Sequence, residues 1–187
     1  MSEPRYVIRT PRIDMAQLGR GMAALPTVLR QLGYSSLRPG QDEVVKCIMS
    51  GRDVLGILPT SLGKTACFIV PTLALKMRTL VFSPLISLMR DQEQSALRKG
   101  VRAGSITSHN PAMAAEYLKQ WLRGDLELLF IAPERLRRDD FLEVMRKMPP
   151  DMVVLDEAHC LIGDHMVATE FGPRRMEDFY LSDQAGH

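Results

Sequence analysis

Three consecutive residues, Gly63-Lys64-Thr65, have the types and order of a phosphate-binding loop. An apolar run from Val54 to Leu58 precedes them and predicts a short buried strand, and a helical pattern follows them. In a strand–loop–helix unit of this kind, backbone N–H groups at the helix start point at an anion, and the helix dipole favours negative charge there. Lys64 would reach the outer phosphates of a nucleotide, and the Thr65 hydroxyl would bind Mg²⁺.

The loop departs from the full phosphate-loop pattern at two positions. Leu58 stands where the pattern has a glycine, and Ser61 stands where many such loops carry another. A left-handed backbone at Ser61 would cost about 1–2 kcal/mol. Because Gly-Lys-Thr alone is a common tripeptide, an ordinary strand–helix turn is the alternative, and the rest of the chain has to decide between the two.

A second group of candidate residues is the acidic pair Asp156-Glu157, which directly follows the apolar run Met152–Leu155. Beside a phosphate loop, this pair suits nucleotide hydrolysis. Asp156 would hold Mg²⁺, and Glu157 would orient and deprotonate the attacking water. Taken alone, such a pair is usually a helix N-cap with a solvated neighbour.

The elements that must position these residues are strands that alternate with helices. Clear strands are predicted around residues 80–82, 126–132 and 152–155, and a weaker one at 102–107. Their apolar runs are continuous, which is typical of an α/β fold with a parallel sheet covered on both faces. Ligands of such sheets bind at the carboxyl ends of the strands, and both Lys64 and the acidic pair lie at such ends.

Helices are expected in the intervening segments. Short apolar periodicity predicts one at 25–32, and another from Pro39 to about residue 50. The helix at 64–76 contains Pro71, which should kink or shorten it. Ser83 is expected to cap the next helix, with Pro84 in its first turn. Asn110-Pro111 should start a further helix that turns Met113 and other apolar side chains inward.

Length and composition suggest one domain with two tails. We expect an N-terminal arm at 1–23, an ATP-binding domain at 24–160 and a C-terminal tail of uncertain structure at 161–187. The formal net charge of +2 is too small to argue for nucleic acid by itself. Three dispersed cysteines fit a reducing compartment, cytoplasmic or nuclear. No run approaches the ~20 apolar residues of a membrane helix.

Several stretches of the chain resemble RecQ-type DNA helicases of superfamily 2, which act in DNA repair and recombination. The similarity covers residues 25–160 and several motifs in the right order. The stretches that carry it are Leu32-Gly33-Tyr34, Arg38-Pro39-Gly40-Gln41, Gly51-Arg52-Asp53-Val54-Leu55, Pro59 to Thr65, Ser83 to Gln92, Ile131 to Leu136 and Asp156-Glu157-Ala158-His159-Cys160.

The resemblance implies a RecA-like P-loop domain that binds ATP and Mg²⁺. Tyr34 and Arg38 would contact the adenine ring by stacking, and Gln41 would read the base edge. Without the resemblance, Gln41 would be interpreted as an ordinary residue at the start of a helix, with no contact to a ligand. The phosphates would be wrapped by Thr60, Ser61, Leu62, Gly63, Lys64 and Thr65.

The resemblance also implies a DNA-binding side. Ser83, Arg90 and Arg135 would face the DNA backbone, where phosphate contacts position the nucleic acid without reading its sequence. Outside this context, Arg90 and Arg135 are ordinary solvated charges. His159 would couple the nucleotide site to the DNA side.

The chain departs from the family beyond Cys160. An aromatic-rich loop that follows in the family does not align, and neither the threonine-rich motif nor a second RecA-like domain is recognisable. That second domain carries an arginine finger worth about 10³–10⁵ in turnover. We therefore expect weak nucleotide binding, slow hydrolysis and no DNA unwinding by this chain alone, and a second lobe or a partner protein as the completing element.

Two other functions remain open from the sequence. One is a non-catalytic ATP- or DNA-binding module that acts through a partner. The other is an unrelated P-loop enzyme such as a small kinase. ATP hydrolysis that DNA stimulates would indicate the helicase lobe rather than the non-catalytic module. Phosphorylation of a small acceptor would identify the kinase.

Overall fold

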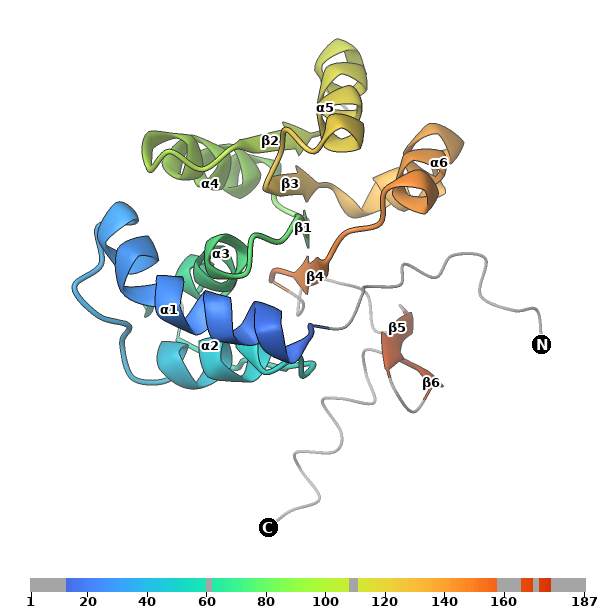
Figure 1. Ribbon diagram of the computed structural model, residues 1–187. Coiled ribbons are helices and arrows are strands. Elements are labelled where there is room, and N and C mark those ends of the chain that lie inside the picture. The colour runs from blue at the N-terminus through green and yellow to red at the C-terminus, as the bar shows by residue number, and fades with distance from the viewer. Residues whose placement is uncertain (1–12, 60–61, 108–110, 158–165, 170–171, 176–187) are drawn as a thin grey trace.

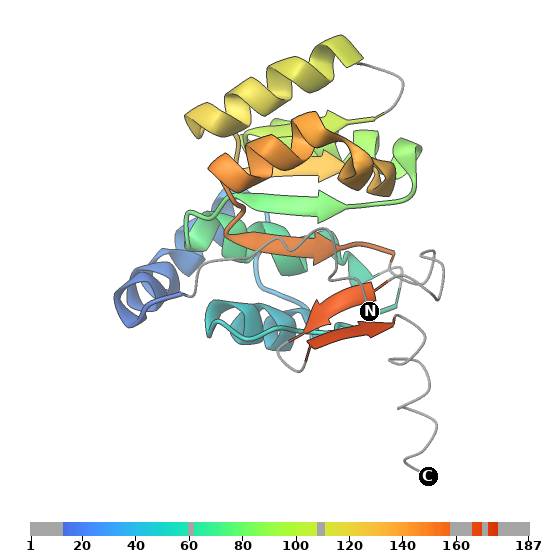
Figure 2. The ribbon, with the colours of Figure 1, turned by 90° about the vertical axis from the view of Figure 1, so that its right-hand side faces the viewer.

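The computed structural model describes residues 13–59, 62–107, 111–157, 166–169 and 172–175. Its centre is a four-stranded sheet in the order β2-β3-β1-β4, in which every neighbouring pair is parallel. Figure 2 shows the four arrows running in the same direction. The strands are β1 Thr79–Phe82, β2 Ala103–Ile106, β3 Leu128–Ile131 and β4 Met152–Leu155.

Helices cover both faces of this sheet (Figure 1). One face carries α1 Met15–Gln31, α2 Gln41–Met49, α3 Thr65–Ala74 and α4 Ile86–Arg98. The other face carries α5 Pro111–Arg123 and α6 Asp139–Lys147, which a 3₁₀ turn at Pro133–Arg137 precedes. A short antiparallel pair follows, β5 Met166–Thr169 with β6 Gly172–Arg175. The predicted α/β fold with a covered parallel sheet is confirmed.

The core consists of two apolar clusters, one on each side of the sheet. Val81 and Phe130 point into the cluster beneath α1–α4, whereas Leu80, Phe82 and Leu129 point into the cluster beneath α5 and α6. The alternation follows from the period of two along a strand. Helix α3 is the most deeply buried helix, with eight of its ten residues buried, so the loop that precedes it is held against a fixed element.

The apolar run Val54–Leu58 is not a strand, so this prediction was wrong. Residues 52–59 have no regular secondary structure, and the side chains of Leu55 and Ile57 are 63% and 77% exposed. A strand forms only where a neighbour offers a free edge in register, and apolar character alone does not supply one. Gly56 within the run also weakens any tendency to form a strand.

Helix α1 is longer than the sequence predicted. It begins at Met15, because the Asp14 side chain accepts the backbone N–H of Gln17 at 2.6 Å and caps the first turn. The helix therefore runs across the expected boundary between residues 23 and 24. Helix α3 ends at Ala74, three residues after Pro71 and short of the predicted end at residue 76.

Two predictions about side chains at helix starts were also wrong. Helix α4 begins at Ile86 with Leu85 at its N-cap, because the Ser83 backbone N–H extends the sheet and donates to the Ile131 carbonyl at 3.1 Å. Ser83 is therefore held by the sheet ladder rather than placed as a helix cap. Met113 in α5 is 40% exposed instead of pointing inward. Asn110 lies outside the described residues.

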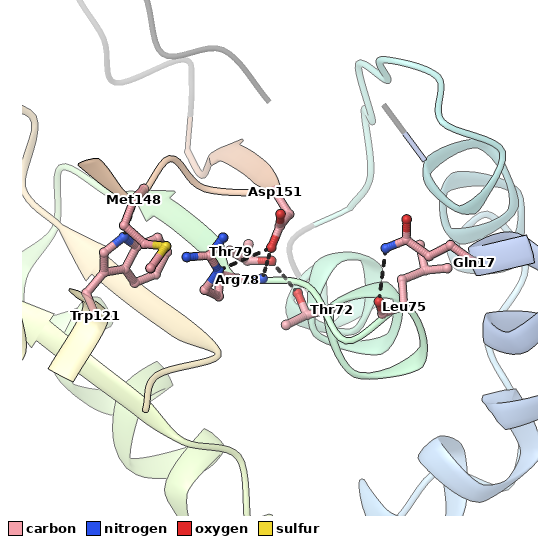
Figure 3. Close-up of polar contacts among 8 residues, drawn as sticks. All are labelled: Gln17, Thr72, Leu75, Arg78, Thr79, Trp121, Met148 and Asp151. Atoms are coloured by element: carbon pink, nitrogen blue, oxygen red, sulfur yellow. Dashed lines mark hydrogen bonds and ion pairs between the residues drawn. The ribbon is translucent and has the colours of Figure 1, made fainter. Parts of the chain in front are cut away.

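The amino-terminal edge of the sheet is closed by paired polar groups (Figure 3). An Asp151 carboxylate oxygen accepts the Arg78 backbone N–H at 2.8 Å and lies 3.4 Å from the Arg78 Nε. The hydroxyls of Thr72 and Thr79 are 2.6 Å apart, which joins α3 to β1. The Trp121 indole N–H donates to a backbone carbonyl at the end of α6 at 2.8 Å. These contacts fix the starts of the strands. The candidate site residues lie at the opposite edge, where the strands end.

Candidate functional site

The Gly63-Lys64-Thr65 turn lies directly before α3. Gly63 has a φ of +79°, a left-handed conformation that glycine adopts without strain. Its carbonyl accepts the Ala66 N–H at 3.1 Å, and α3 begins at Thr65. A helix start next to a lysine and a hydroxyl is a suitable site for a phosphate group. Thr60 and Ser61 lie outside the described residues.

The lysine of this turn contacts the end of β4. Lys64 Nζ lies 3.0 Å from a Glu157 carboxylate oxygen, although the two residues are 93 positions apart in the sequence. The side chains are 28% and 14% exposed, so the ion pair is largely shielded from solvent. Glu157 has a φ of +50°, a conformation that is uncommon for a residue with a Cβ. The predicted convergence of Lys64 and the acidic pair is thus present in the structure.

Asp156 is buried beside this ion pair. Its backbone N–H donates to the Phe82 carbonyl at 2.8 Å, which keeps it in register with the end of β1. One carboxylate oxygen accepts the Gln92 side-chain amide at 2.9 Å, and the other accepts the Glu157 N–H at 3.1 Å. The carboxylate is therefore fixed from two sides, as a preorganised metal ligand would be.

Gln41 anchors the predicted phosphate loop. Its side chain is 5% exposed, and its Nε2 donates to the carbonyls of Leu62 and Gly63 at 2.6 and 3.1 Å. Its Oε1 accepts the Arg38 backbone N–H at 2.8 Å. Both amide hydrogens thus have acceptors within the described residues. The family resemblance implied a base contact at Gln41, but nothing in the sequence indicated that this residue holds the loop.

Tyr34 lies at one end of a pocket of about 280 Å³. Lys99, at the end of α4, donates to the Tyr34 hydroxyl at 3.1 Å, and its Nζ lies 4.6 Å from the ring centroid. The pocket joins this pair to the phosphate loop and is lined by Tyr34, Gly63, Thr65, Asp91, Gln92, Ser95 and Lys99. It therefore brings the predicted base-stacking residue and the predicted phosphate-binding residues to one cavity.

Sequence reasoning missed the contribution of α4 to this pocket. Asp91, Ser95 and Lys99 are spaced by four residues, so they lie on one face of the helix. That spacing of polar side chains was visible in the sequence, but such a face is usually a solvated one. Only its position opposite the phosphate loop makes it part of the site.

The residues present fit a magnesium ion. Mg²⁺ prefers hard oxygen ligands and keeps several waters, and the site offers the Asp156 carboxylate and the Thr65 hydroxyl. Lys64 is already paired with Glu157, so the Asp156 carboxylate contacts the Gln92 amide and the Glu157 N–H but no cationic side chain among the described residues. Within the described part of the chain, no three His, Cys, Asp or Glu side chains gather to form an all-protein metal cage.

The predicted DNA-contacting residues have different surroundings. Arg90 is exposed on α4, as a phosphate-contacting residue would be. Arg135 is half-buried in the turn after β3, and its Nε has no partner among the described residues. Ser83 is fully buried, so its side chain is not exposed for a DNA contact, and a contact through the segment that begins there stays a prediction. Ser83 lies below the surface because the sheet ladder continues through its backbone. His159 lies outside the described residues.

No helix in the described ranges is both long and apolar enough to cross a membrane.

Comparison with known proteins gives a family. The model of the DEAD/DEAH box helicases matches residues 38–175. An ATP-dependent DNA helicase RecQ of Pasteurella multocida is 34% identical over 150 residues, which cover 80% of this chain and 24% of the relative. An ATP-dependent DNA helicase Q-like 5 of Arabidopsis thaliana is 40% identical over 131 residues, which cover 69% of this chain and 14% of the relative. The chain thus spans about a quarter or less of these relatives.

A solved structure supports the fold. The hypothetical ATP-dependent RNA helicase of Sulfolobus tokodaii is similar with a TM-score of 0.57 and 19% sequence identity, over 78% of this chain and 42% of that one. At this identity the likeness concerns the fold, which is the RecA-like α/β fold predicted from the sequence. The family model spans residues 38–175, and the two helicase relatives match 80% and 69% of the chain. The chain therefore belongs to the DEAD/DEAH box helicases and corresponds to an N-terminal, RecQ-like lobe.

Proposed function

We propose that this chain is the ATP-binding motor lobe of a RecQ-like DNA helicase, in which ATP hydrolysis is coupled to DNA strand separation in the complete protein. The observation that carries the proposal is the 3.0 Å contact between Lys64 and Glu157. It joins a phosphate loop to an acidic strand end, which are the two parts that nucleotide hydrolysis requires. The proposed setting is intracellular, with single-stranded or partly duplex DNA as the partner.

Each residue then has a chemical role. The Lys64 ammonium leaves Glu157 when a nucleotide binds and neutralises outer phosphate oxygens. Glu157, once released, accepts a proton from the water whose oxygen forms a bond to the γ-phosphorus, while the bond between that phosphorus and the β–γ bridging oxygen breaks. Asp156 and Thr65 would hold Mg²⁺, which supplies charge neutralisation to the triphosphate.

The ion pair also defines the charge of the site before a nucleotide binds. Lys64 and Glu157 are 3.0 Å apart and neutralise each other. When a triphosphate binds, Lys64 exchanges Glu157 for the phosphate oxygens. Glu157 is then free of the lysine and acts as the base for the attacking water. ADP and inorganic phosphate are the products.

A measurement of ATP hydrolysis with and without single-stranded DNA tests this function. We expect slow hydrolysis that rises when DNA is added, and no strand displacement by this chain alone, because a second lobe is needed to close around ATP. Hydrolysis at the level of a Lys64→Ala variant, together with no measurable ATP binding, would refute the proposal.

The second candidate is a non-catalytic nucleotide- or DNA-binding module that acts through a partner. The observation that favours it is the exposed segment before the loop, where Leu55 and Ile57 lie outside the sheet. A phosphate loop that no strand anchors is less well fixed for catalysis than for binding. Nucleotide affinity without turnover, unchanged by DNA, would support this second function over the first.

A further inference from the structure

We propose that Gln92 is a positioning residue for Asp156, which it holds in the orientation that magnesium binding requires. Its side-chain Nε2 donates to Asp156 Oδ2 at 2.9 Å, from a helix 64 residues earlier in the chain. This inference rests on the proposed function, because it assigns a task at the metal end of the same site. The donor of this hydrogen bond comes from α4, outside both the phosphate loop and the acidic pair.

The chemistry of the two groups fixes which way the amide points. An ionised carboxylate only accepts hydrogen bonds, so the –NH₂ of Gln92 has to face Asp156. The amide oxygen of Gln92 is then the atom turned away from the carboxylate. That oxygen is buried and has no donor among the described residues. A buried acceptor without a donor is costly, so its retention needs a reason.

The position of Gln92 supplies that reason. The residue contacts Asp156 and lines the same pocket as Gly63 and Thr65, so it links the carboxylate to the cavity beside the phosphate-binding turn. A water bound to a divalent cation is a strong hydrogen-bond donor, and Mg²⁺ usually keeps several such waters. One end of the amide would thus orient the carboxylate, and the other end could accept from a water ligand of the ion.

The backbone of α4 makes this support rigid. Its Met89 and Ala96, which flank Gln92 in the sequence, are buried in the core, so the helix cannot move without disturbing the sheet. Asp156 is tied on its other side to the end of β1 by its backbone N–H. A carboxylate held between a helix and two strands loses little freedom when it binds a metal, which favours affinity.

The competing interpretation is a structural hydrogen bond with no bearing on the metal. The two interpretations differ in what they predict for magnesium. A structural bond would, when removed, weaken the whole domain and all nucleotide binding in proportion. A positioning bond would, when removed, leave magnesium-free nucleotide binding in place and reduce only the contribution of the ion.

The experiment compares the full chain with Gln92→Met, which keeps the length and helix propensity of the side chain but has no amide. The dissociation constant of ADP is measured by calorimetry without magnesium and across a MgCl₂ titration. We expect the magnesium-free constant to stay within about twofold, and the apparent magnesium affinity of the ADP complex to fall about tenfold or more. The Gln94→Met variant, on the exposed face of the same helix, should behave like the wild type.

Two results would overturn the inference. One is a magnesium titration of Gln92→Met that coincides with that of Gln94→Met. The other is an equal loss of ADP affinity with and without magnesium, which is the signature of a structural bond. Thermal unfolding of both variants shows whether the comparison is made between equally folded proteins.

Failure of the proposed function is distinguishable from failure of this inference. If the wild-type chain does not bind ADP at all, the proposed function fails, and the Gln92–Asp156 contact is then judged by NMR. The Gln92 side-chain amide signals should differ between the spectra of the wild type and of Asp156→Ala. Unmoved amide signals would show that the contact on which the inference depends does not exist in solution.

Discussion

The amino-terminal and carboxyl-terminal edges of the parallel sheet differ in whether their buried polar side-chain atoms have hydrogen-bond partners. At the amino-terminal edge, the side chains of Asp151 and Trp121 each have a hydrogen-bond partner. At the carboxyl-terminal edge, Ser83, Gln92 and Arg135 each carry a buried side-chain atom without a partner, and within the described residues no other side chains do. The buried polar side chains named at the amino-terminal edge have partners within the protein. Those at the carboxyl-terminal edge have unpaired atoms that a bound ligand would be able to contact.

This difference agrees with the separation of stability and function in one domain. Buried polar groups that are paired stabilise the fold, whereas unpaired ones cost about 1–3 kcal/mol each. Glu157 adds a backbone in an uncommon conformation to the same edge. The paired edge can support these costs, because it fixes the starts of β1 and β4. The following predictions test whether stability and binding do separate in this way.

The largest effect is expected from Trp121→Ala at the amino-terminal edge. The side chain is fully buried, and its removal leaves a cavity that should lower the free energy of unfolding by about 3–5 kcal/mol. Urea denaturation followed by circular dichroism measures it. Trp121→Phe keeps most of the buried ring and serves as the control. A loss below about 1 kcal/mol for the alanine variant would contradict the assignment of this edge to stability.

Lys64→Ala tests the opposite edge. ATP hydrolysis should fall to background, because the variant lacks the ammonium that we propose to contact the outer phosphates. The matched control is Lys46→Ala, which removes a solvent-exposed ion pair with Asp42 and should leave hydrolysis unchanged. The free energy of unfolding should change by less than about 1 kcal/mol in the control. Turnover that persists in Lys64→Ala would remove this lysine from the mechanism.

Asp151→Ala should affect stability without affecting the site. The substitution leaves the Arg78 backbone N–H and guanidinium without their acceptor, which should cost about 1–3 kcal/mol of unfolding free energy. The dissociation constant of ADP, measured below the unfolding transition, should stay within about twofold of the wild type. A large loss of ADP affinity in a folded Asp151→Ala protein would show that the two edges are coupled.

Lys99→Met sharpens the comparison within the pocket. If the Lys99–Tyr34 contact orients the ring for a base, ADP should bind about two- to fivefold more weakly, as expected for a partly exposed cation–π contact. Inorganic tripolyphosphate, which has no base, should bind as it does to the wild type. Lys119→Met, at an exposed position on the opposite face of the sheet, is the control. Equal weakening for both ligands would assign Lys99 to the phosphates instead.

The smallest effect concerns a paired group away from both edges. Burial, and then the nearby Glu93, raises the pKa of Tyr117 to about 12 from an ordinary value of 10.0. Because the folded-state pKa is the higher one, the stabilisation from this group is complete below pH 10 and is lost as the pH rises toward 12. Between pH 9 and pH 11, the free energy of unfolding measured in urea should fall less for Tyr117→Phe than for the wild type. An equal fall in both proteins would show that the ionisation of Tyr117 does not cause the pH dependence.

The sequence predicted those parts of the site that depend on strand ends. Lys64 and Glu157 were expected to converge on the premise that both follow strands that end at one edge of a parallel sheet. They do lie 3.0 Å apart, although only Glu157 follows a strand. The strands themselves were also predictable, since continuous apolar runs such as Leu128–Ile131 are fully buried in the sheet. The same reasoning failed for Val54–Leu58, because an apolar run does not specify whether a neighbouring strand is available to it.

Local composition thus determined the class of fold and the order of most of its elements, and it indicated a candidate phosphate-binding turn, because these depend on periodicity and on short motifs. Tertiary structure alone decided that Gln41 holds that loop, that Gln92 contacts Asp156 and that Lys99 covers Tyr34. The physical reason is that each contact joins residues more than 20 positions apart, through side chains whose sequence patterns are those of ordinary solvated helix faces. Packing of α4 against β2 and β3 places such a face around the same pocket as Gly63 and Thr65.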